Sequence, residues 1–206
     1  MEKLLTLEQR KIWLKISEEL GKDSEEILLW AIAMRKTFEK KGVEYDVAVF
    51  NAFEFVELLQ CDLCWLLNDM VKHDSAWRGG FYARLIVLTV YESCKSLNSL
   101  LARKFREEFV KSLGLTEDSS LKSIHSSFCK LFEQCRKDFG DVRNGIVGHR
   151  DCDPETRIRL LKQANCRAVA DLAIAMLEPL RELQEIFLPY IRHITNKLGP
   201  AESSPK

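Results

Sequence analysis

The 206-residue chain is 46% apolar and 30% charged, so it can bury a core and remain in solution. Its 9 glycines and 5 prolines are too few for an all-β or loop-rich protein of this length. The 31 basic side chains equal the 31 acidic ones, which argues against a protein that coats nucleic acid non-specifically. Residues 136–167 carry a local excess of eight basic groups over five acidic ones, which indicates a solvated helix face or a local basic site.

Two helices are predicted at the start of the chain. Thr6-Leu-Glu-Gln9 has the pattern of a capping box, in which the Thr hydroxyl and the Gln side chain satisfy free backbone amides. The helix that follows is expected to end at Gly21, a residue that readily adopts positive φ. Asp23-Ser24-Glu25-Glu26 then starts a second helix, which ends at Lys40-Lys41-Gly42. We therefore expect an N-terminal helical hairpin over residues 1–42.

A third helix is predicted over residues 45–73, and it is apolar around most of its girth. Such a helix lies either at the centre of a bundle or in an oligomer interface. Residues 73–80 are expected to form a loop. A fourth helix is expected over about 81–113, because its apolar residues keep a period near 3.6.

The second half of the chain is also predicted to be helical. A fifth helix should follow Asp118 and reach the region of Gly145 and Gly148. Asp153-Pro154-Glu155 is a strong signal for the start of a short helix, because proline at the first helical position sacrifices no hydrogen bond. This short helix should break near residues 163–165.

A last long helix should extend to about residue 198, with kinks at Pro179 and Pro189. The chain is thus predicted to be all-α, an antiparallel bundle of about five to seven helices in a single domain over residues 1–198. The hairpin would precede the main bundle of residues 45–198. Residues 199–206 should be a disordered tail.

The cysteines and most of the histidines are predicted to have structural roles. Cys61-Asp-Leu-Cys64 has redox or zinc spacing, but no second cysteine pair or paired histidine follows it at a metal-like interval. Both thiols fall in an apolar helical stretch, so we expect core packing and no metal or other cofactor. His73, His125 and His193 share no spacing typical of a catalytic or metal site, and we assign them surface or capping roles.

Charged residues interrupt every apolar run of the sequence. The longest uncharged stretch is the eight residues 27–34, far below the roughly 20 needed to span a bilayer. The first residues also lack the apolar run of a signal peptide. We therefore expect a cytoplasmic protein without a membrane partner.

The segment Arg143-Asn144-Gly-Ile-Val-Gly-His149 concentrates side chains that can carry out chemistry. His149 titrates near neutrality and can act as a general acid or base. Arg143 offers a permanently charged fork that matches phosphate oxygens, and Asn144 could orient either of them. A weaker interpretation is that Arg143 and Arg150 pair with nearby aspartates and that His149 interacts with a helix dipole.

This motif resembles the hallmark of the HEPN superfamily (higher eukaryotes and prokaryotes nucleotide-binding), an Arg followed by a polar residue and, a few positions later, a His. Arg150-Asp151 and the upstream helix that begins at Arg84 look most like the abortive-infection AbiU-type branch. The resemblance extends over residues 45–198 by helix order, and only the short motif is specific. The His-x-Tyr ending of the toxin branch is absent, since His149 is followed by Arg150-Asp151.

The resemblance implies a metal-independent endoribonuclease, in a phage-defence or toxin–antitoxin setting. Its site would be assembled where two protomers meet, and it would yield 2′,3′-cyclic phosphate ends. Arg143, Asn144 and His149 would be catalytic, and we expect Arg150 and Arg157 to contact RNA. The implied partners are single-stranded RNA or tRNA, a second copy of the chain, and an antitoxin or regulatory protein, with no DNA substrate. The alternative is a non-catalytic helical module for dimerisation or for binding nucleotides or RNA.

Overall fold

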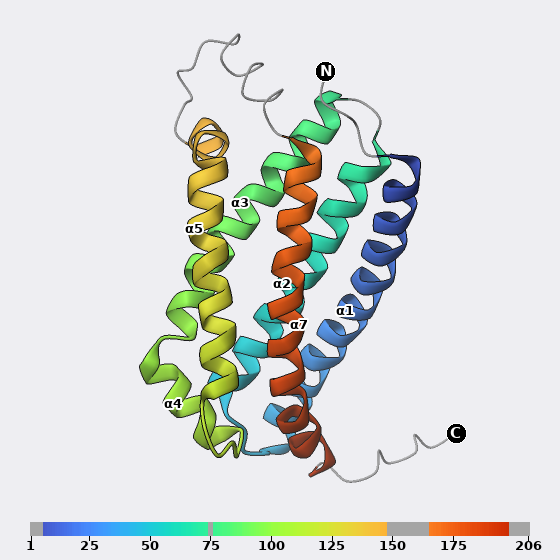
Figure 1. Ribbon diagram of the computed structural model, residues 1–206. Helices are drawn as coiled ribbons and strands as arrows, with labels where there is room; N and C mark the ends of the chain where they lie inside the picture. Colours follow the sequence, from blue (N-terminus) through green and yellow to red (C-terminus); the bar gives the residue numbers. More distant parts are fainter. Residues whose placement is uncertain (1–5, 74–75, 148–164, 198–206) are drawn as a thin grey trace, which may run out of the picture.

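The computed structural model describes residues 6–73, 76–147 and 165–197, and within these ranges every regular element is a helix. Four long helices form a bundle in which successive helices run in opposite directions (Figure 1). A further long helix packs along one side of this bundle, and a short one lies at its lower corner. The bundle helices are α2 (Val47–Lys72), α3 (Ala76–Leu100), α5 (Ser119–Val147) and α7 (Cys166–Asn196); the side helix is α1 (Leu7–Lys41) and the corner helix α4 (Arg103–Ser112). The predicted all-α bundle is confirmed.

Helix α1 begins where the first predicted helix begins and ends where the second predicted helix ends. The Thr6 hydroxyl accepts from the Gln9 N–H at 3.2 Å, and the Gln9 side chain accepts from the Thr6 N–H at 3.1 Å, so the capping box forms. At the other end Gly42 adopts φ 66°, the left-handed conformation that glycine allows. The predicted break at Gly21 is wrong, because α1 runs without interruption through it, and the expected hairpin is one helix.

Gly21 is buried because α1 and α2 approach each other closely there. A Cβ atom at this position would lie 3.2 Å from Cβ of Cys64, closer than most real contacts. The glycine therefore permits helix contact and does not end a helix. Other small residues on the same face of α1 are also buried: Ser17, Ser24 and Ala31.

Helix α2 lies at the centre of the molecule. It contacts α1 on one side and α3 and α7 on the others. Most of its apolar residues are covered within one chain, whereas Val47 and Leu58 are exposed. A polar link joins it to α1, where the Asn68 amide donates to the Ser17 hydroxyl at 3.1 Å. The central position, one of the two predicted explanations, thus accounts for most of the apolar girth of α2.

The region from 73 to 113 differs from the prediction in two places. Helix α3 already begins at Ala76, so Gly79 and Gly80 are helical and the expected loop is shorter. The single helix predicted over 81–113 is divided at Ala102, whose ψ of 156° is extended. This turn lets α4 bury Phe109, whose ring packs edge-on against Phe187 of α7 at 5.5 Å.

The last two bundle helices begin where the sequence predicts. Helix α5 begins just after Asp118 and reaches Val147. Asn165 caps α7 by accepting from two backbone N–H groups, and the helix continues through Pro179 and Pro189. The predicted helix start at 153–155 and the predicted tail at 199–206 lie outside the described residues. None of the described helices has an apolar stretch long enough to cross a bilayer.

Candidate functional site

The residues of the Arg–His motif lie at the end of α5 and beyond it. Arg143 and Asn144 belong to the last turns of this helix, whose backbone is described to Val147. Their side chains lie outside the described part of the structure. His149, Arg150 and Arg157 lie outside the described residues. The structure thus fixes the helix that carries Arg143 and Asn144, and the meeting of these groups with His149 remains a prediction.

A second group of chemically capable side chains lies at the lower end of the bundle, around Arg106. Arg106 of α4 is only 8% exposed. Its Nη1 donates to the Leu101 carbonyl at 2.7 Å, and its Nε donates to Asp118 Oδ2 at 3.2 Å. Nη1 also lies 3.2 Å from Nδ1 of His125 on α5. One guanidinium therefore joins the ends of α3, α4 and α5.

The environment of His125 defines its tautomer. A guanidinium only donates, so Nδ1 of His125 must accept from Arg106, and the ring proton of the neutral form is on Nε2. That nitrogen lies 3.7 Å from Cys129 Sγ, which donates in turn to Asn98 Oδ1 at 3.4 Å. Burial and the Arg106 charge lower the pKa of His125, which favours its neutral form.

His125 is half-buried and contacts Arg106 and Cys129, which the predicted surface or capping role did not include, whereas His73 ends α2 as its C-cap residue. The sequence does contain one signal of the His125 group, because His125 and Cys129 are four residues apart and share a helix face. It does not indicate Arg106, because that contact depends on the turn between α3 and α4.

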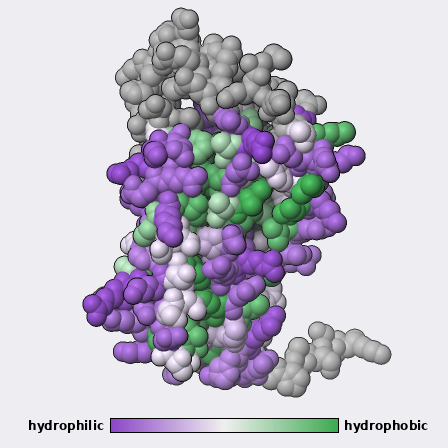
Figure 2. All heavy atoms as spheres, viewed as in Figure 1, coloured by the Kyte–Doolittle hydropathy of each residue, from purple (hydrophilic) through white to green (hydrophobic). Residues whose placement is uncertain are grey.

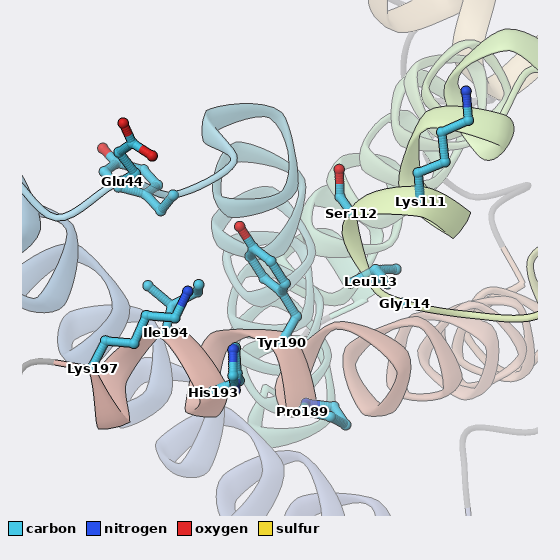
Figure 3. A pocket seen from close by; sticks show the side chains of 11 residues that line it. Glu44, Lys111, Ser112, Leu113, Gly114, Pro189, Tyr190, His193, Ile194 and Lys197 are labelled. Carbon is cyan, nitrogen blue, oxygen red and sulfur yellow. The ribbon is translucent and has the colours of Figure 1, made fainter.

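Two surface hollows adjoin this region. The first has a volume of about 620 Å³ and is lined by Arg103, Arg106, Lys111 and Lys122, with Glu107 and Asp118. The second, of about 670 Å³, lies between the end of α4 and α7 (Figure 3). Lys111 lines both hollows.

Figure 3 shows Tyr190 and His193 projecting from α7 into the second hollow, with Lys111 and Lys197 at its two ends. Its wall is held by Asp46, which caps α2 by accepting from two backbone N–H groups at 2.9 and 3.1 Å. The Ser112 hydroxyl donates to the same carboxylate, and the Tyr190 hydroxyl accepts from the Asp46 N–H at 2.6 Å. The end of α4, the start of α2 and α7 are thereby tied together around the hollow.

The described residues offer no metal centre. Within them no three His, Cys, Asp or Glu side chains gather as a metal site would require, and the cysteines form no disulfide with one another. Cys64 is fully buried, and burial raises its thiol pKa to about 12, which suits a packing role. Cys61 is half-buried beside it.

Comparison with protein-family models, with curated proteins and with solved structures finds no match for this chain.

Proposed function

We propose that this protein is a HEPN-like, metal-independent endoribonuclease in which Arg143, Asn144 and His149 act on RNA. The observation that carries the proposal is the place of the motif in an all-α bundle. Helix α5 is described to Val147, so Arg143 and Asn144 lie on its last turns and His149 follows two residues later. The end of α5 and the start of α7 lie at the same end of the bundle (Figure 1).

The chemistry requires three events on the RNA. A base removes the proton of a ribose 2′-OH, the 2′-oxygen attacks the adjacent phosphorus, and the 5′-oxygen leaves with a proton from an acid. The products are a 2′,3′-cyclic phosphate and a 5′-OH end. Arg143 would stabilise the extra negative charge of the phosphorane, and Asn144 would orient the reacting groups. Arg150 and Arg157 would hold neighbouring phosphates of the RNA.

One histidine cannot be both base and acid in the same step. A second copy of the chain would supply a second His149, which is why the proposal includes a homodimer. Light scattering at micromolar concentration should give a mass near twice the 23.8 kDa of one chain. A monomer would contradict the two-protomer site. The biological setting that we propose is cytoplasmic phage defence or a toxin–antitoxin pair, with a regulatory partner.

The decisive experiment is cleavage of single-stranded RNA and tRNA in the presence of EDTA. His149→Ala and Arg143→Ala should each reduce the rate by at least about 10²-fold, the usual effect of losing a general acid–base or a transition-state charge contact. Arg143→Lys should also lose most activity if the contact with phosphate is bidentate. Arg181→Ala is the matched control, because Arg181 is an exposed arginine of α7 paired with Glu185.

The products should carry cyclic phosphate ends, and single-stranded DNA should resist cleavage because it lacks the 2′-OH. If wild type and His149→Ala behave alike on a broad panel of RNAs, the catalytic proposal fails. Binding of RNA without cleavage would then favour the non-catalytic binding module.

A further inference from the structure

The two hollows at the lower end of the bundle form one continuous basic surface, which we call the basic corner. They are joined by Lys111, which lines both. The outer side of α4, at the lower left of Figure 2, is hydrophilic. The basic corner is made by Arg103, Arg106, Lys111, Lys122, His193 and Lys197. Three carboxylates, those of Glu44, Glu107 and Asp118, line the same hollows.

The lysines of the basic corner carry the positive charges that are available to bind an anion. Arg103 pairs with Glu107 at 3.0 Å, and Arg106 pairs with Asp118 at 3.2 Å. Lys111, Lys122 and Lys197 make no ion pair with any residue that the structure describes. The chain as a whole has no net charge, so this surplus of cations is local. Its field would attract an anion to the hollows.

Arg106 gives the basic corner a fixed donor. Its side chain is nine-tenths buried and is held by Asp118, the Leu101 carbonyl and His125. These contacts use Nε and Nη1, and the two N–H groups of Nη2 make no hydrogen bond within the described ranges. Because Arg106 lines the first hollow, this preorganised end of the fork is free to donate to a bound oxyanion. Helix α5 also begins beside Asp118, and its N-terminal dipole favours negative charge.

We propose that the basic corner binds spaced phosphate groups, either along a polynucleotide backbone or on a free polyphosphate. Arg106 would anchor one phosphate in the first hollow beside Lys111 and Lys122, and His193 and Lys197 would contact a second at the far end of the second hollow. The basic corner lies at the start of α5, whereas the Arg–His motif lies at its end. A 29-residue helix separates the two by about 40 Å. The phosphate site is therefore distinct from the proposed catalytic site and does not depend on it.

The test measures binding without cleavage. A fluorescent single-stranded oligodeoxynucleotide, which lacks the 2′-OH, reports polynucleotide binding by anisotropy, and inorganic tripolyphosphate is titrated separately by calorimetry. The double variant Lys111→Glu/Lys122→Glu reverses two exposed charges. Lys15→Glu on α1, which lines neither hollow, is the matched control. Thermal melting of all variants checks that they fold.

We expect the double variant to bind at least about 10-fold more weakly than wild type and to show a shallower dependence on salt, since two phosphate contacts are lost. Lys15→Glu should bind like wild type. Binding of the oligonucleotide identifies a polynucleotide as the ligand, and binding of tripolyphosphate alone identifies a free polyphosphate. The proposal is overturned if neither probe binds, or if the double variant and Lys15→Glu bind equally well. Neither outcome would affect the ribonuclease proposal, which is tested by cleavage.

Discussion

Glu57 is the most unfavourably placed ionisable group in the described core, and its replacement should stabilise the protein. It lies on α2 with no exposed surface, and neither carboxylate oxygen has a hydrogen-bond partner of good geometry among the described residues. Burial raises its pKa to about 7, and the nearby side-chain amide of Gln184 opposes this shift only in part. The folded protein therefore resists ionisation of Glu57.

The magnitude follows from the linkage between proton binding and folding. In the unfolded chain Glu57 ionises near its ordinary pKa of 4.5, whereas in the folded protein it stays protonated up to about pH 7. Because the folded state holds the proton more tightly, stability is present at low pH and is lost as the pH rises through this window. The full difference in pKa corresponds to roughly 3 kcal/mol of unfolding free energy.

The assay is urea unfolding of wild type and of Glu57→Gln at about pH 4.5 and pH 8. Changes in packing affect both pH values alike, so the pH-dependent part of the difference isolates the ionisation. We expect Glu57→Gln to gain roughly 3 kcal/mol relative to wild type between these two pH values. Glu178→Gln, an exposed glutamate of α7, should show no such gain. An equal difference between Glu57→Gln and wild type at both pH values would refute the reasoning.

Two further predictions concern helix packing and capping. Gly21→Leu should destabilise the protein by about 1–3 kcal/mol in urea unfolding, because a Cβ there already meets Cys64 at 3.2 Å. Gly140→Ala should instead stabilise it by up to about 1 kcal/mol, because its Cβ would meet nothing within 4 Å. Equal effects would contradict the close approach of α1 and α2. Asp46→Ala should cost about 1–2 kcal/mol of unfolding free energy, because the cap of α2 is lost. Asp46→Asn should cost much less, because Asn retains a capping oxygen. Equal losses in the two variants would show that the cap contributes little.

Local signals were sufficient to predict most helix ends. The Thr6 box and Gly42 act through hydrogen bonds and backbone angles within a few residues, which a sequence displays directly. Gly21 shows where such reasoning fails. A glycine followed by Asp23 and two glutamates has the local pattern of one helix ending and another beginning, yet the residue serves a contact with α2, which is about forty positions away in the sequence. Tertiary packing overrides the local preference there.

The same distinction applies to the candidate sites. The motif from Arg143 to His149 is recognisable because its residues are close together in the sequence. The group around Arg106 is not, since it requires a guanidinium from α4, an imidazole from α5 and a carbonyl at the end of α3. The sequence places a continuous helix at that point, and on such a helix Arg106 could not turn back toward His125. The error about the helix and the missed contact therefore have one cause.

The pH dependence of the His125 group is hidden in the wild type and should emerge when Glu57 is replaced. The pKa of His125 is lowered in the folded protein by burial and by Arg106, so its neutral form is favoured and its contribution to stability is lost as the pH falls below about 6.5. Glu57 acts in the opposite direction over an overlapping window, since the protein gains stability as that carboxyl becomes protonated. In the wild type the two effects partly cancel.

Glu57→Gln removes the carboxyl effect and keeps the histidine effect. The free energy of unfolding of this variant should therefore fall as the pH is lowered from about 7.5 to 5.5. The comparison is with the double variant Glu57→Gln/His125→Asn, in which Asn can still accept a hydrogen bond from Arg106 but cannot be protonated in this range. The double variant should lose less stability over the same interval. Its absolute stability at pH 7.5 reports packing, whereas the change with pH reports the imidazole alone. Equal losses in the two variants would show that the pKa of His125 is not lowered by folding, and that its contact with Arg106 does not hold the ring neutral.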